Sequence, residues 1–224
     1  MKKLLLLSLV ALLGAATLCA APTRPNVVDR IQSCEAILRE FIARPAIGPS
    51  REAWAKAKGV LILNQFKAGF LLGVQDGYVV ILVKKKEGWS LPVLINAGEA
   101  SIGFQLGAKS VESVFIITDE ATPRMLFSQR FNIGVDAKAV AGPKAAETER
   151  NNQEILKTPL LAYTKSTGLY AGATVKAGHI SRDDSANFLL YNTRYTLPEL
   201  LYSDWVQPVD EVKPLMALVR QLSP

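Results

Sequence analysis

The sequence is poor in the residue types that bind metals and carry out acid–base chemistry, since its 224 residues include one His and two Cys. Transition-metal sites are built largely from several His and Cys ligands, so this supply excludes them. A single imidazole, His179, also excludes chemistry that needs two, and two Cys cannot make a disulfide-dense scaffold. Charged residues make up only 21% of a chain that is 49% hydrophobic, which excludes a disordered protein. Binding is therefore a better expectation than catalysis.

Catalytic and nucleotide-binding motifs are also missing. Ser101 lies in EASIG, but Glu99 stands where a nucleophile elbow needs its first Gly, and His179 is the only base on offer. The AGPK stretch at 141–144 lacks the remaining P-loop residues, and no EF-hand loop is present. The sequence predicts a protein that is not an enzyme and holds no cofactor.

The N-terminus reads MKKLLLLSLVALLGAATLCA, with two Lys followed by an apolar run from Leu4 to Leu18. That run is shorter than the roughly 20 residues of a transmembrane helix, and small residues follow it, so residues 1–20 are predicted to be a secretory signal peptide. Two alternatives stay open: a retained membrane anchor, and a lipoprotein lipidated on Cys19, which Leu18 fits poorly. Either way we predict an exported protein, periplasmic or envelope-associated.

Without the leader the chain keeps 24 basic and 20 acidic residues, a formal charge of +4. This modest charge, together with export, disfavours nucleic acid as a partner. Only Cys34 remains, so no intramolecular disulfide is possible, and a small buried side chain is favoured over a reactive thiol.

Helical spacing is clear near the start of the mature chain. Apolar residues recur at three- and four-residue steps over 26–43, and Ser50 is placed to cap a short helix in REAWAKAK. A further short helix is expected in VKPLMALVRQL near the C-terminus. We divide the mature chain into a helical segment, 21–49, and a β-rich domain with a C-terminal helical extension, 50–224.

From Gly59 onward the pattern of residues is typical of consecutive antiparallel strands. Short runs rich in β-branched and aromatic residues are separated by Gly, Asn, Asp and Pro, and a two-residue alternation returns over 168–180. Hairpin turns are predicted at QDG, 75–77, and KEG, 86–88. The fold class is therefore α+β: a single β-rich domain with an N-terminal amphipathic helix and short C-terminal helices.

Basic residues next to aromatic ones are the strongest candidates for a binding site. Lys84, Lys85 and Lys86 follow an apolar strand and precede Trp89, and Lys67 lies between two Phe residues. Such lysines suit an anionic lipid surface, and Trp favours the membrane interface. The alternative is a solvated hairpin end whose lysines block edge-to-edge aggregation.

Four blocks carry a resemblance to a known family: AKGVLILNQFKAGFLLG, GWSLPVLINAGEASIGFQLGAKS, FNIGVDAKAVAGP and YTKSTGLYAGATVKAGHISRDDSANFLLY. In this order, over about residues 50–195, the chain resembles the SYLF domain family, also called the Ysc84-type actin-binding or DUF500 family. The resemblance implies binding of phosphoinositides and membranes, actin binding in fungal members, and exported or lipid-anchored envelope proteins in bacteria. It implies no catalytic residues.

The residues and the resemblance together predict a non-enzymatic module of the bacterial cell envelope that binds anionic phospholipids or similar phosphoinositide-like lipids. The alternative prediction is a structural or protein-interaction module of the envelope with a protein partner there.

Overall fold

The computed structural model describes residues 22–125, 139–141 and 159–224. Within these ranges it describes the backbone alone for 67–76, 98–109, 139–141 and 166–180, and for Met125. The predicted leader, including Cys19, lies outside the described residues, and so does most of the segment between β3 and β5.

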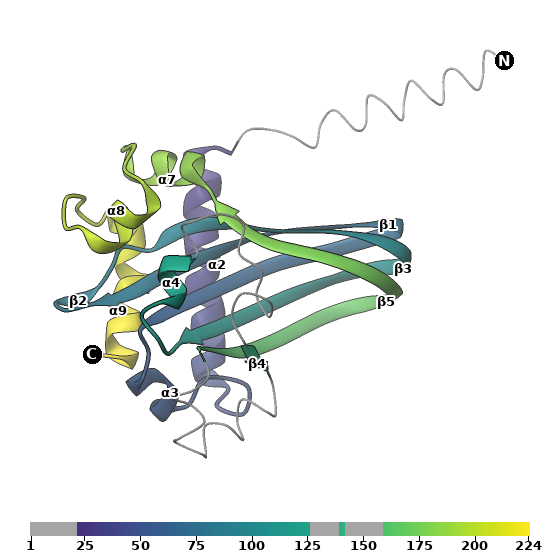
Figure 1. Ribbon diagram of the computed structural model, residues 1–224, viewed down its shortest axis with the longest axis horizontal. Helices are drawn as coiled ribbons and strands as arrows, with labels where there is room; N and C mark the ends of the chain where they lie inside the picture. The colour runs from purple at the N-terminus through teal and green to yellow at the C-terminus, as the bar shows by residue number, and fades with distance from the viewer. Residues whose placement is uncertain (1–21, 126–138, 142–158) are drawn as a thin grey trace, which may run out of the picture.

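The described helices and strands are those of an α+β protein, as the sequence predicts (Figure 1). The helices are α2 (Arg24–Ala43), α3 (Arg51–Ala55), α4 (Thr122–Met125), α7 (Asp184–Tyr191), α8 (Leu197–Tyr202) and α9 (Lys213–Leu222), with the 3-10 turn η2 (Asp210–Val212). The strands are β1 (Gly59–Lys85), β2 (Gly88–Trp89), β3 (Val93–Ile117), β4 (Ala139–Ala141) and β5 (Leu160–Arg182).

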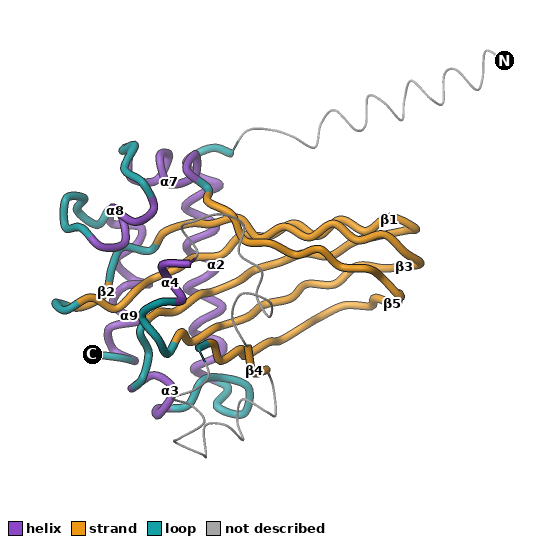
Figure 2. Tube along the Cα trace, in the orientation of Figure 1, coloured by secondary structure: helices purple, strands orange, loops and turns teal. Residues whose placement is uncertain are grey.

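The strands form one sheet in the order β2-β1-β3-β5-β4. All neighbours are antiparallel except β4 and β5, which run parallel. Figure 2 shows the three long strands leaving the helical end of the molecule, curving at the far end and returning. The two ends of β1 therefore lie side by side, and the Lys84 amide donates to the Lys58 carbonyl at 2.8 Å.

The bent strands are nested. β3 pairs with both halves of β1. Ile117 at the end of β3 pairs with Gly59 at the start of β1, and Val93 at the start of β3 pairs with Ile81 in the returning half of β1. β5 follows β3 in the same way along its whole length. The predicted turn at QDG, 75–77, is wrong, because these residues lie within β1, where Gln75 pairs with Glu99. The strand bends back on itself, because Gly77 lies close to Asn64 and Gln65 of its first half.

Gly77 allows the returning half of β1 to come close. A Cβ atom at this position would lie 2.7 Å from the Asn64 carbonyl oxygen and 2.9 Å from the Gln65 Cα. Any larger residue would push the two halves apart, so the glycine serves close backbone approach and does not form a turn.

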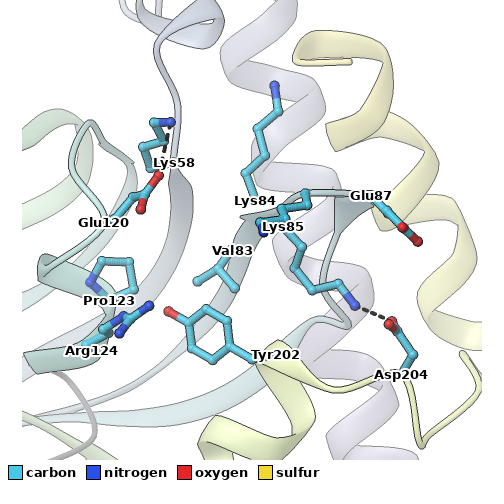
Figure 3. Close-up of a pocket in the computed structure, with 11 residues that line it drawn as sticks. Lys58, Val83, Lys84, Lys85, Glu87, Glu120, Pro123, Arg124, Tyr202 and Asp204 are labelled. Atoms are coloured by element: carbon cyan, nitrogen blue, oxygen red, sulfur yellow. Dashed lines mark hydrogen bonds and ion pairs between the residues drawn. The ribbon is translucent and has the colours of Figure 1, made fainter.

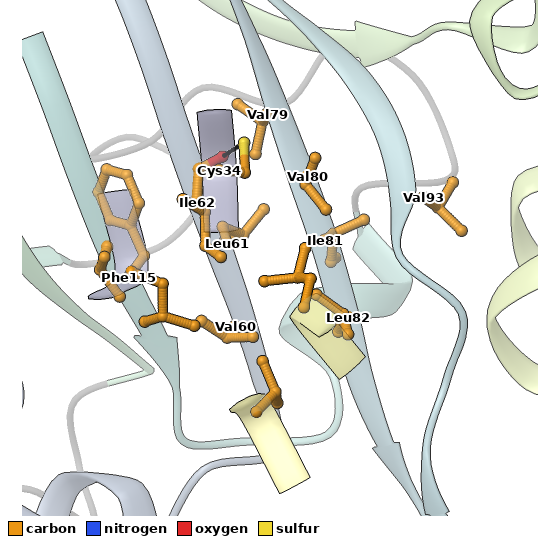
Figure 4. Close-up of a cluster of buried hydrophobic side chains, with 14 of the residues drawn as sticks. Cys34, Val60, Leu61, Ile62, Val79, Val80, Ile81, Leu82, Val93 and Phe115 are labelled. Atoms are coloured by element: carbon orange, nitrogen blue, oxygen red, sulfur yellow. Dashed lines mark hydrogen bonds between the residues drawn. The ribbon is translucent and has the colours of Figure 1, made fainter. Parts of the chain in front are cut away.

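The helix predicted over 26–43 is α2, which Thr23 caps and which packs on the sheet. Its inward residues recur at helical spacing: Val27, Ile31, Cys34, Ile37, Leu38 and Phe41. Cys34 meets β1, where its Sγ lies 3.6 Å from the Ile62 carbonyl oxygen, beside the apolar side chains of both halves of the strand (Figure 4). Burial raises the pKa of the Cys34 thiol, which keeps it protonated and structural, as expected.

Among the described residues, no helix has both the length and the apolarity to cross a membrane. The C-terminal helices instead cover the end of the sheet where the strands begin and finish (Figure 1). The amphipathic α9 buries Leu215, Met216, Leu218 and Val219 there. This end of the molecule also carries the lysine-rich turn.

Candidate functional site: a cation-rich cavity at the β1–β2 turn

The KEG turn is confirmed, and it joins β1 to β2. Lys84 pairs with Trp89 and Lys85 with Gly88 across the short hairpin, and Lys86 and Glu87 form its tip. Gly88 has a φ of 107°, a backbone conformation that favours glycine. The local sequence therefore fixes where the three adjacent lysines lie.

Trp89 does not point to the surface. Its side chain is buried, and its indole Nε1 donates a hydrogen bond of 2.7 Å to the Ser223 carbonyl beyond α9. The predicted membrane contact by Trp89 is wrong, because the C-terminal helix covers the ring and satisfies its only donor. A partner 134 positions away leaves no signal in the local sequence.

Two of the three lysines are held by the protein itself. The Lys84 ammonium donates to the Ser223 hydroxyl at 3.1 Å and to the Pro224 main-chain oxygen at 2.7 Å. Lys85 makes an ion pair with Asp204. Lys86 is exposed and forms no ion pair within the described part of the chain. Lys67 lies in β1 opposite Lys109, and its side chain is not among those described, so its predicted role stays a prediction.

A surface cavity of about 640 Å³ opens beside this turn (Figure 3). Its lining combines five cations with three carboxylates, an aromatic ring and two apolar residues: Lys58, Lys84, Lys85, Lys86, Arg124, Glu87, Glu120, Asp204, Tyr202, Val83 and Pro123. The cavity thus brings all three predicted lysines together and leaves an excess of positive charge. Lys58, Arg124 and Tyr202 join it from distant parts of the chain, which the sequence analysis missed.

The positive charges in the cavity differ in how far they are neutralised. Lys58 pairs with Glu120 at 3.3 Å. Arg124 of α4 instead stacks over the Tyr202 ring, 5.9 Å from its centroid. Partial burial raises the pKa of Tyr202, so this phenol stays neutral and contributes no negative charge. The exposed Lys86 and the stacked Arg124 are the cations best placed to meet an anion.

Ser101 and His179, the other residues singled out from sequence, lie in stretches where the structure describes the backbone alone. Asp183 caps α7 by accepting from the Ala186 amide and pairs with Arg30 at 3.3 Å, so it serves the fold. Within the described ranges, no group of three or more His, Cys, Asp or Glu residues is placed to hold a metal ion.

Comparison with known proteins agrees with the family resemblance. The model of the Ysc84 family, described as "Las17-binding protein actin regulator", matches residues 98–222. The chain is 27% identical over 194 residues to the Bos taurus "SH3 domain-containing YSC84-like protein 1", covering 84% of this chain and 57% of that protein. It is 29% identical over 209 residues to "LAS seventeen-binding protein 3" of Saccharomyces cerevisiae (strain YJM789), covering 92% and 42%.

A third relative is "Protein YSC84" of Saccharomyces cerevisiae (strain ATCC 204508 / S288c), 31% identical over 169 residues, with coverage of 73% of this chain and 36% of the yeast protein. The chain thus spans little more than half of the mammalian relatives' length, and less of the yeast proteins'. No solved structure matches.

The bent sheet, the helix packed on it and the cavity define an α+β domain with a cation-rich surface. Because the family model covers more than half of it, the chain belongs to the Ysc84 family, also called the SYLF family. The family description names a regulator that binds protein and names no catalytic activity.

Proposed function

We propose that this protein is a non-enzymatic module that binds anionic phospholipid headgroups, and that the cavity at the β1–β2 turn is the binding site. The observation that carries this proposal is the cavity itself, where five cations meet three carboxylates. A phosphodiester headgroup carries the negative charge that this excess of cations attracts.

The fixed and the free cations have different roles. Lys84 is held by Ser223 and Pro224 and contributes positive potential at a constant position, whereas Asp204 balances the charge of Lys85. Lys86 and Arg124 supply the direct contacts, and an arginine can bind a phosphate through two parallel hydrogen bonds. Each basic residue near an anionic bilayer contributes about 1 kcal/mol, which corresponds to roughly a fivefold change in affinity.

Vesicle sedimentation tests the proposal. We expect the protein to sediment with vesicles containing phosphatidylglycerol and to remain in solution with pure phosphatidylcholine. Lys86→Gln should weaken binding about fivefold, and the charge reversals Lys86→Glu and Arg124→Glu should weaken it more. Binding should also fall as salt rises, because screening weakens attraction between exposed charges.

Arg51→Glu is the matched control. It makes the same change in net charge at an exposed site outside the cavity, and a carboxylate suits the first turn of α3. The proposal is overturned if Lys86→Glu and Arg124→Glu bind like Arg51→Glu, or if neutral vesicles are bound as tightly as anionic ones.

We propose further that the protein acts at the bacterial cell envelope after export. The support is the leader-like sequence of residues 1–20, in which Cys19 is the alternative lipid attachment point. Mass spectrometry of the native protein would distinguish cleavage after Ala20 or Ala21 from a diacylated Cys19. An intact Met1 in the native protein would contradict both.

A second candidate function, protein binding, is favoured by the relatives' printed names. The yeast relative is named a LAS seventeen-binding protein, and the family description calls its members actin regulators. Co-sedimentation with actin filaments, run beside the vesicle experiment, separates the two candidates. Saturable binding to filaments without binding to anionic vesicles would replace the lipid proposal.

A further inference from the structure

Exposed aromatic rings gather in one short stretch near the C-terminus. Four of the exposed large hydrophobic side chains in the described residues lie between positions 188 and 205, and we call them the aromatic rim: Phe188, Tyr195, Tyr202 and Trp205. Trp205 is the most exposed of the four, at 65%. Large apolar side chains that are exposed in one region of a protein often mark an interaction site.

Two of the rim residues contact each other, and the other two lie beside arginines. The rings of Tyr195 and Trp205 lie 5.4 Å apart between centroids. The Arg194 guanidinium lies 5.9 Å from the Phe188 ring, and Arg124 lies equally far from the Tyr202 ring. Phe188, Arg194 and Tyr195 also line a second, smaller cavity of about 280 Å³. The surface is thus aromatic and cationic at once.

The aromatic rim continues directly from the cation-rich cavity. Tyr202 and Asp204 line that cavity, and Trp205 is the next residue along the chain. Figure 1 shows the loop after α8 and the β1–β2 turn at the same end of the molecule, away from the curved end of the sheet. The Asp204 carboxylate pairs with Lys85, and Asp184 at the smaller cavity lies 3.9 Å from Arg182, so both acids have cationic partners.

We propose that the aromatic rim inserts into the interfacial layer of the bilayer whose headgroups occupy the cavity, with Trp205 as the principal anchor. This inference rests on the function proposed above and deepens it. Trp and Tyr favour the membrane–water interface, where one part of the ring meets acyl chains and its polar atom meets water. The cations on both sides of the rim, Lys86, Arg124 and Arg194, match an anionic bilayer in charge.

The fluorescence of the protein's own Trp residues tests this proposal. Of its three Trp residues, Trp54 and Trp89 are only 3% and 4% exposed, so a change in emission on vesicle binding reports Trp205. With vesicles containing phosphatidylglycerol, we expect a blue shift and quenching by phosphatidylcholine brominated on its acyl chains. Trp205→Phe supplies the background, and in this variant both changes should disappear.

Affinity gives a second readout. Trp205→Ala should weaken vesicle binding by about tenfold, because a large aromatic ring no longer leaves water. The control is Ile42→Ala, which removes a 37% exposed apolar side chain from α2, outside the rim, and should leave vesicle binding unchanged. Both side chains are exposed, so the midpoints of urea unfolding should stay close to that of the unmodified protein.

The outcomes separate this inference from the function on which it rests. If anionic vesicles are bound without quenching of Trp205, and Trp205→Ala binds normally, the rim proposal is overturned and the headgroup proposal stands. If neutral vesicles bind equally well and quench Trp205, the rim is the anchor and the headgroup proposal falls. If no vesicle is bound and Trp205 emission is unchanged, both are overturned.

Discussion

Asn187 shows how one buried polar side chain joins a helix to the sheet. It lies in α7 at 3% exposure, and its amide oxygen accepts from the Leu94 backbone N–H at 2.9 Å. Its Nδ2 donates to the Leu94 carbonyl at 2.8 Å and to the Asp183 carbonyl at 2.9 Å. The side chain therefore pairs with both polar groups of one β3 residue, as a neighbouring strand would.

At this scale we expect Asn187→Leu to lower the free energy of unfolding by about 2–4 kcal/mol, because both backbone groups of Leu94 lose their partner in a buried place. Urea unfolding measures it as a lower midpoint at unchanged slope. Asp184→Glu, at an exposed position of the same helix, keeps the acidic charge of its first turn and should stay within about 0.5 kcal/mol. Equal effects of the two substitutions would show that the amide does not hold α7 on the sheet.

At the scale of elements, α9 holds the lysine-rich hairpin in place. It buries Leu215 completely, and the residue after it, Ser223, accepts from Trp89 and Lys84. We expect Leu215→Ala to cost about 2–5 kcal/mol through the cavity left behind. Hydrogen exchange should also accelerate at β2 more than at α3. Ala217→Glu, on the exposed face of α9, is the control and should stay within about 0.5 kcal/mol. Uniform acceleration across the chain would contradict a local anchoring role.

The same elements show how far sequence carries the fold and the site. Helical periodicity predicted α2 and α9, and Gly88 marked the turn that presents Lys84–Lys86, because both signals are local. The nesting of β1 within β3, the burial of Trp89 and the entry of Arg124 into the cavity depend on contacts between distant segments. The aromatic rim could have been noticed as Tyr195, Tyr202 and Trp205 in a polar, proline-containing stretch. Their exposure, however, is a property of the folded chain.

For the molecule as a whole, stability should be highest between about pH 5 and 8.5 and fall on both sides. On the acid side, hydrogen bonding to Lys165 lowers the pKa of Glu40, and Lys213 lowers that of Asp210. A carboxyl group with a lowered folded-state pKa stabilises the fold above its unfolded-state pKa, and this stability is lost as pH falls through the folded value.

On the alkaline side, burial raises the pKa of Cys34 and of Tyr191. The stability that these two protonated groups contribute to the fold is complete below their unfolded-state pKa values, ordinarily 9.0 and 10.0, and is lost as pH rises above those values.

Midpoints of urea unfolding, measured from acid to alkaline pH, test the loss of stability on each side, which we call the acid and the alkaline limb. Two variants, one for each limb, serve as controls for each other. Cys34→Ala removes a thiol that ionises only in the unfolded chain, so its profile should be flatter from about pH 9 upward and parallel to the original below that pH. Lys165→Gln returns the pKa of Glu40 toward its ordinary value, so stability should fall less steeply at acid pH. Because the pKa of Lys165 is itself raised, this variant should change the alkaline side only above about pH 10.5. If Cys34→Ala left the alkaline limb as steep as before, the thiol would have to reach solvent in the folded state. That result would contradict the packing of α2 against β1, on which the arrangement of the sheet and the cavity depends.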